Sequence, residues 1–270
     1  MPATRDRVTD STFTDEELQI AEQMQSQNLP LWREALLGVD WLALRFSPVF
    51  QGVGIPHGDG SPVVLIPGFM GSDRYLGDMR SWLGKIAYNP YLSGIGRNVQ
   101  CPNTLSERLH ETMERAYDET GEKVHLIGHS LGGVIARSAA ARWPDITASV
   151  ITLASPFRGV RAHPLVLVAA SFVRGTIAAQ RAASSRKAQP DCFTGKCSCA
   201  FVEALKTDLP RSIVDTAIYT KTDGVLDWER CMSGDPRVDI EVKGTHVGLA
   251  FNPTVYSHIA NRLALAVVQH

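Results

Sequence analysis

Short apolar runs rich in β-branched residues recur along the chain, and stretches whose apolar residues have helical spacing separate them. The clearest run covers residues 62–67 and predicts a central strand that is buried on both faces. Four more strands are predicted, and helices lie between or after them. The strands are expected at 123–127, 148–153, 213–220 and 237–242, and the helices at 75–87, 103–120, 132–142 and 254–268. This alternation predicts an α/β fold, with a mostly parallel central sheet and helices on both faces.

The first sixty residues precede this alternation and are predicted to form an N-terminal helical extension, residues 1–60, packed on the core. Thr14 is a candidate helix N-cap, Glu17 completes a capping box three residues later, and the helix is expected to reach Met24. The segment 30–45 carries its apolar residues on one stripe, which predicts a second helix that packs through this stripe.

One long interval interrupts the alternation of strands and helices. The stretch between the predicted strands that end at 153 and begin at 213 is too long for a simple crossover. We therefore expect a helical cap at about 158–212, inserted into an α/β domain that covers 61–270.

Composition and charge narrow the class of protein. The 270 residues are 44% hydrophobic and 20% charged, and a chain of this length can bury a core without a metal or a disulfide. Its 27 basic and 28 acidic side chains nearly balance, which argues against nucleic-acid binding. The longest apolar run, 165–173, is about half of what a membrane span needs. Residues 1–30 resemble no signal peptide, so we expect no integral membrane segment and a cytoplasmic location.

The five cysteines do not predict a metal site. Cys192, Cys197 and Cys199 lie close together, but they have no nearby His and no second half-site. Free thiols in a loop are the favoured interpretation, and a local disulfide is the alternative in an oxidising compartment. Since a nucleotide-binding glycine loop and a cofactor lysine are also absent from the sequence, no cofactor is predicted.

The strongest chemical signal is the sequence GHSLGG at 128–133, which follows a predicted strand and opens a predicted helix. It matches the G-x-S-x-G pattern of a nucleophile elbow. Ser130 would lie on a turn so tight that side chains at 128 and 132 would collide with neighbouring backbone. The first N–H groups of the following helix would face the reacting oxygen. Ser130 is therefore the predicted nucleophile.

A serine nucleophile needs a base, and in this arrangement an acid and then a His follow the Ser along the chain. His246 lies in a glycine-flanked loop after the last predicted strand, where α/β folds collect reacting groups, whereas His258 lies in a predicted helix. Asp223 follows the preceding strand and is the predicted acid, which would orient the imidazole. Asp227, four residues further on, is the alternative.

An oxyanion hole needs two backbone N–H groups near the developing negative charge. Leu131, directly after the nucleophile, is expected to supply one of them. The second is expected from the loop after the first buried strand, where Gly68 lets the backbone turn inward. Phe69 is the favoured donor in this loop and Met70 is the alternative.

These segments together resemble the α/β-hydrolase family, and more narrowly its lipase and carboxylesterase branch. The resemblance covers about 62–265 and is carried by the loop 67–71, the elbow, and the loops around Asp223 and His246. It implies an α/β-hydrolase fold and the hydrolysis of carboxylic esters through an acyl-enzyme, with a small-molecule or lipid ester as substrate. Pro67 stands where many lipases carry the His of a His-Gly pair.

Several functions remain open within this resemblance. An acyltransferase, a thioesterase or an amidase would use the same Ser, His and Asp. A non-catalytic hydrolase-like binding protein is a further alternative, although all three residue types of the triad are present. The apolar part of the predicted cap, around 165–173, would line an acyl pocket or pack the cap against the sheet.

Overall fold

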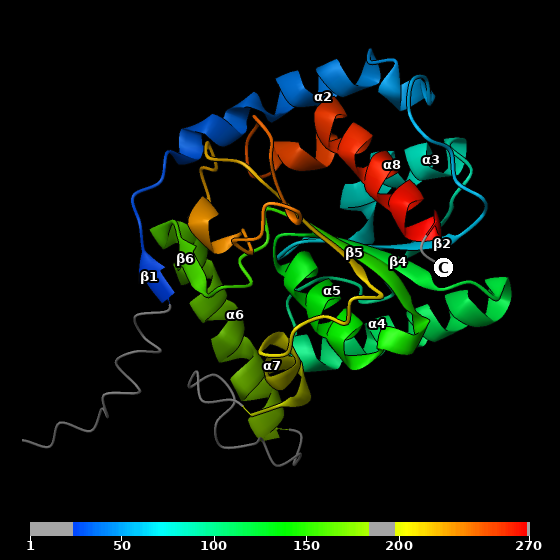
Figure 1. Ribbon diagram of the computed structural model, residues 1–270. Helices are drawn as coiled ribbons and strands as arrows, with labels where there is room; N and C mark the ends of the chain where they lie inside the picture. Colours follow the sequence, from blue (N-terminus) through cyan, green and yellow to red (C-terminus); the bar gives the residue numbers. More distant parts are fainter. Residues whose placement is uncertain (1–23, 184–197, 269–270) are drawn as a thin grey trace, which may run out of the picture.

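The computed structural model describes residues 24–183 and 198–268, and its centre is a six-stranded sheet (Figure 1). The strand order is β3-β2-β4-β5-β7-β8, and every neighbouring pair is parallel. The strands are β2 (Pro62–Ile66), β3 (Asn89–Leu92), β4 (Val124–His129), β5 (Thr147–Leu153), β7 (Val214–Tyr219) and β8 (Asp239–Glu241). Every residue of β2, β4 and β5 is buried, which confirms the central strands predicted from short apolar runs.

Helices cover both faces of the sheet, as predicted (Figure 1). One apolar core lies between the sheet and the helices α2, α3 and α8, and a second lies between the sheet and α4, α5 and α7. Successive side chains of a strand point to opposite faces, so Val63 and Leu65 enter the first core while Val64 and Ile66 enter the second. The helices are α2 (Leu37–Arg45), α3 (Gly77–Lys85), α4 (Pro102–Thr120), α5 (Leu131–Arg142), α7 (Ala200–Leu205) and α8 (Pro253–Val268).

Three strands were not predicted from the hydrophobic pattern. The edge strand β3 is half-exposed and contains Asn89 and Pro90, so it lacks the apolar run that marks the central strands. β1 (Met24–Ser26) and β6 (Val160–Ala162) form a separate two-stranded parallel sheet. Most of the helix predicted from Thr14 to Met24, residues 14–23, lies outside the described residues. Met24, its last predicted residue, belongs to β1.

The predicted helix at 30–45 is present as a 3-10 helix, η1 (Leu31–Leu36), followed by α2. Its apolar stripe does not pack on the core as expected: Trp32, Leu36 and Val39 are at least half exposed. The segment contacts the domain through its other side, where Leu44 is fully buried. Figure 1 shows η1 and α2 crossing one end of the molecule beside α8.

The range of the predicted cap contains β6, α6 (Pro164–Ala183) and α7. α7 packs against α4 and α5, and Cys199, a free and partly buried thiol, contributes to that core. Cys192 and Cys197 lie outside the described residues. Within the described parts of the chain, no group of three His, Cys, Asp or Glu side chains could hold a metal ion. None of the helices described there is long and apolar enough to cross a membrane.

Candidate active site

Ser130 lies on the turn between β4 and α5, with φ 53° and ψ −125°. A residue other than glycine rarely adopts such a positive φ, and strained backbone of this kind persists only where the surroundings enforce it. The Ser130 N–H donates to the carbonyl oxygen of Leu153 (2.8 Å), which fixes the turn to the end of β5. A Cβ on Gly128 would overlap the backbone of α5, and one on Gly132 would lie 2.5 Å from the carbonyl oxygen of Pro67. The two glycines therefore permit the turn that presents Ser130.

His246 and Asp223 lie on the loops that follow β8 and β7. Nδ1 of His246 is 2.7 Å from Oδ2 of Asp223, and both side chains are buried. An ionised carboxylate only accepts hydrogen bonds, so Nδ1 carries the proton and Nε2 of the neutral imidazole is left as a proton acceptor. Oδ1 of Asp223 accepts from the N–H groups of Val225 (2.8 Å) and Leu226 (2.7 Å). Both carboxylate oxygens of Asp223 are thus held by specific partners.

The alternative acid, Asp227, has a different local role. Its carboxylate accepts from the N–H of Glu229 (3.2 Å) and caps the 3-10 helix η5 (Trp228–Arg230). His258, the rejected alternative base, lies within α8 as the sequence predicted. The structure therefore brings Asp223 to His246 and keeps Asp227 at the start of η5.

Two neighbouring imidazoles in the site have opposite electrostatic environments. Burial disfavours a charged His246, but the charge and hydrogen bond of Asp223, together with the charge of Glu34, outweigh burial and raise the pKa of His246. Burial and the nearby His246 lower the pKa of His129 to about 3. His129 is therefore neutral near pH 7, and its Nε2 donates to the carbonyl oxygen of His246 (2.9 Å). This bond ties the residue before Ser130 to the loop of His246.

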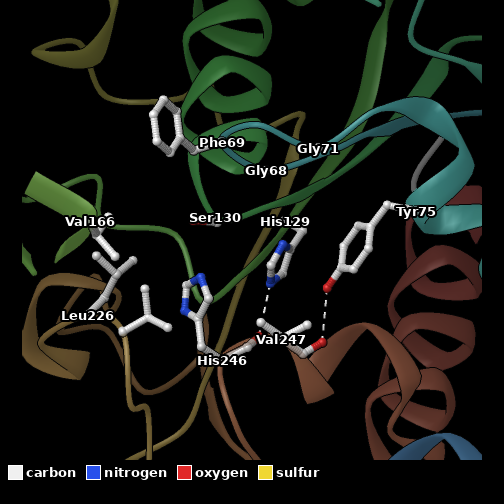
Figure 2. A pocket seen from close by; sticks show the side chains of 11 residues that line it. Gly68, Phe69, Gly71, Tyr75, His129, Ser130, Val166, Leu226, His246 and Val247 are labelled. Atoms are coloured by element: carbon white, nitrogen blue, oxygen red, sulfur yellow. Dashed lines mark hydrogen bonds between the residues drawn. The ribbon is translucent and has the colours of Figure 1, made fainter. Parts of the chain in front are cut away.

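The loop 67–71 lies beside Ser130 and contains both candidates for the second oxyanion donor (Figure 2). The Met70 N–H donates to the carbonyl oxygen of Asn98 (3.0 Å), so Met70 is not available and that alternative is wrong. Within the described residues, the N–H groups of Phe69 and Leu131 donate to no carbonyl or side chain. The buried Asn98 amide also donates to the carbonyl oxygen of Pro67 (2.9 Å). Asn98 thus fixes the loop while the Phe69 N–H stays available.

Ser130, His246 and Phe69 meet at one pocket of about 250 Å³ (Figure 2). Most of the other side chains that line it are apolar or aromatic. The remaining lining residues are Gly68, Gly71, Tyr75, His129, Val166, Val225, Leu226 and Val247. Figure 2 shows the imidazole of His246 directed into the space between Ser130 and the aliphatic side chains of Val166 and Leu226. The pocket can therefore hold an apolar group next to a hydroxyl and an imidazole.

Sequence reasoning missed Tyr75, Asn98 and Glu34. The Tyr75 hydroxyl donates to the carbonyl oxygen of Val247 (2.9 Å), and its ring lies 5.3 Å from that of His129. Asn98 holds the loop 67–71, and Glu34 accepts hydrogen bonds from the backbone of the His246 loop. None of the three stands in a motif or next to a predicted site residue along the chain. Only the tertiary contacts identify them.

Known families and known sequences include relatives of this chain. A family model described as palmitoyl protein thioesterase matches residues 62–205, just over half of the chain. A triacylglycerol lipase of Burkholderia plantarii is 32% identical over 134 residues, which cover 46% of this chain and 37% of that protein. The chain therefore spans little more than a third of the length of this relative.

Solved structures with low sequence identity have the same fold. A candidate aryl esterase from Burkholderia cenocepacia matches with a TM-score of 0.53 at 17% identity, covering 78% of this chain and 93% of that one. A structure reported with the metagenome-derived lipolytic enzymes LipS and LipT matches with a TM-score of 0.51 at 14% identity, covering 80% and 96%. At such identities the likeness shows the fold alone.

Proposed function

Because this α/β-hydrolase belongs to the palmitoyl protein thioesterase family, we propose that it is a serine hydrolase that cleaves carboxylic esters through an acyl-enzyme. The family and the fold confirm the resemblance that the sequence motifs indicated.

In the proposed reaction, Oγ of Ser130 attacks the ester carbonyl while Nε2 of His246 takes its proton. Asp223 keeps the other imidazole nitrogen protonated and stabilises the imidazolium. The N–H groups of Phe69 and Leu131 donate to the oxyanion of the tetrahedral intermediate. His246 then passes the proton to the leaving alcohol, and a water molecule, activated by the same base, releases the acid and restores Ser130.

One observation carries the proposal: a strained serine and an aspartate-bound histidine line the same small pocket. A serine hydroxyl is a weak nucleophile without a base, and a buried Asp–His pair is what orients such a base. The raised pKa of His246 also supports this role, because it reflects stabilisation of the imidazolium that the reaction would form.

The pocket supports a preference for short or medium acyl chains. Its volume, about 250 Å³, lies below the roughly 300–1,000 Å³ of sites that enclose a drug-sized ligand. Val166 of α6 lines it, and the neighbouring Leu165 and Val168 are exposed, so a longer chain would extend along α6. A series of p-nitrophenyl esters, measured with and without an emulsified interface, tests this. A kcat/KM that rises steadily up to the longest chain would contradict it.

A thioester is the second candidate substrate class, and the family description favours it. The same triad would attack a thioester carbonyl, since only the leaving group changes. Hydrolysis of an oxygen ester and a thioester with the same acyl chain distinguishes the two. A higher kcat/KM for the oxygen ester favours the first proposal, and a higher value for the thioester favours the second.

Replacing Ser130 by Ala tests the proposal directly. We expect ester hydrolysis to fall by at least about 10⁴-fold, with the thermal unfolding midpoint nearly unchanged. A fluorophosphonate probe should label the wild-type protein once and the Ser130→Ala variant not at all. Ser257→Ala in α8, which removes a half-buried serine away from the pocket, is the matched control and should keep the wild-type rate. Activity that survives Ser130→Ala would rule the mechanism out.

A further inference from the structure

Glu34 joins the two loops that carry Asp223 and His246. It stands in η1, on the N-terminal segment, and is partly buried. Its Oε1 accepts from the N–H groups of Gly224 (3.1 Å) and His246 (3.0 Å), and its Oε2 accepts from that of Val247 (2.9 Å). Hydrogen bonds to an ionised acceptor are stronger than bonds between neutral groups. A single carboxylate therefore fixes the distance between the loop of the acid and the loop of the base.

The two loops are shaped to admit the N-terminal segment. A Cβ on Gly224 would lie 2.8 Å from the carbonyl oxygen of Pro30 and 3.0 Å from Oε1 of Glu34. A Cβ on Gly248 would overlap the carboxylate of Asp40. Glycine at both positions lets the backbone of each loop approach the segment closely. The contact thus depends on residues from both sides.

We propose that Glu34 is a positioning residue of the active site: it holds the Asp223 and His246 loops in register. This inference rests on the proposed serine hydrolase function. Glu34 is not among the described residues that line the pocket, so it acts on substrate only through His246. It also lies outside the residues matched by the family model, 62–205.

The charge of Glu34 acts on His246 together with several other groups. Asp223 is the nearest charge and makes the direct hydrogen bond. His129 and Tyr75 also face the site, but both stay neutral, because burial lowers the pKa of the first and raises the pKa of the second. Asp40, on the same segment as Glu34, has a pKa raised by burial and by Glu34. Glu34 is therefore the charge beyond Asp223 whose removal should alter the titration of His246 most.

Glu34→Gln tests the proposal through the pH dependence of turnover. The variant removes the negative charge. Its amide N–H₂ also replaces one of the two carboxylate oxygens, so at least one backbone N–H that donates to Glu34 in the wild type loses its acceptor. We expect kcat to fall by about tenfold to a hundredfold, as for a small misplacement of reacting groups, with KM unchanged. His246 must be neutral to accept a proton, and Glu34 stabilises its charged form. The acidic limb of the kcat/KM profile should therefore move to lower pH in Glu34→Gln.

Two further variants make the test specific. Glu34→Asp keeps the charge but shortens the side chain, so kcat should fall while the acidic limb stays near that of the wild type. This variant carries the test if Glu34→Gln does not yield folded protein. Glu203→Gln removes an exposed charge that pairs with Lys206 on α7, and it should change neither kcat nor the acidic limb.

The outcomes separate this inference from the proposed function. A shifted limb in Glu34→Gln and a lowered kcat in both Glu34 variants support it. Wild-type kcat in the folded variants, or a lowered unfolding temperature as the only change, would overturn it. If Ser130→Ala abolishes activity while the Glu34 variants behave as wild type, only the role of Glu34 fails. If Ser130→Ala remains active, the proposed function fails first.

Discussion

Asp223→Asn gives the sharpest test of the Asp223–His246 pair. The substitution keeps the size of the side chain and its acceptor for the N–H groups of Val225 and Leu226. However, the amide N–H₂ that replaces Oδ2 would donate to Nδ1 of His246, which now lies 2.7 Å from a carboxylate oxygen. The imidazole would then carry its proton on Nε2, so the atom that faces Ser130 could no longer accept one.

The size of the effect follows from the loss of the base and of the stabilising charge. A wrong tautomer in an equivalent triad lowers kcat by about 10⁴-fold, which corresponds to about 5 kcal/mol in the barrier. Asp223 also contributes more than any other group to raising the pKa of His246, so the imidazolium formed during attack would lose its main stabilisation. We therefore expect kcat to fall by about this factor. KM should change little, because Asp223 is not among the described residues that line the pocket.

Steady-state hydrolysis of a short p-nitrophenyl ester measures the change, and circular dichroism checks that the variant is folded. Asp227→Asn is the matched control, because it makes the same substitution four residues away at the cap of η5. Asn is as good a helix cap as Asp, so activity should stay within a few-fold of the wild type. A larger loss in Asp227→Asn than in Asp223→Asn would refute the assignment of the acid.

Three further predictions follow from the geometry of the site. Asn98→Ala should lower kcat about tenfold with little change in KM, since it removes the side-chain hydrogen bond to Pro67 that helps to hold the loop of the Phe69 N–H; an unchanged kcat would contradict this. Gly132→Ala should destabilise the fold by about 3 kcal/mol and lower the unfolding midpoint by roughly 10 °C, whereas Gly38→Ala, whose Cβ meets nothing within 4 Å, should not. Because the pKa of His246 is raised and the base must be neutral, kcat/KM should decline as pH falls through a value above the usual imidazole pKa of about 6.5. An acidic limb below that value would argue against His246 as the base.

Local sequence determined the central sheet and the turn of Ser130. Strands buried on both faces are mostly apolar on both faces, and the sequence predicts the three such strands of this chain within one or two residues. The elbow at 128–133 could also be predicted from the sequence, because only glycine fits at 128 and 132, where neighbouring backbone lies so close. The loops of Asp223 and His246 could be placed at the same edge, since parallel strands all end there.

Tertiary structure alone decided the contacts between distant segments. The edge strand β3 and the pair β1 and β6 form because a partner strand is available, not because of their own hydrophobic pattern. Whether Asp223 or Asp227 bonds to His246, and whether Phe69 or Met70 keeps an available N–H, depends on loop conformations that residue spacing does not specify. Glu34 is the clearest example of a contact that the sequence does not predict, because a glutamate in a predicted helix is normally expected to face solvent. Its hydrogen bonds arise only when η1 folds over two loops about two hundred residues away, where their backbone N–H groups need an acceptor.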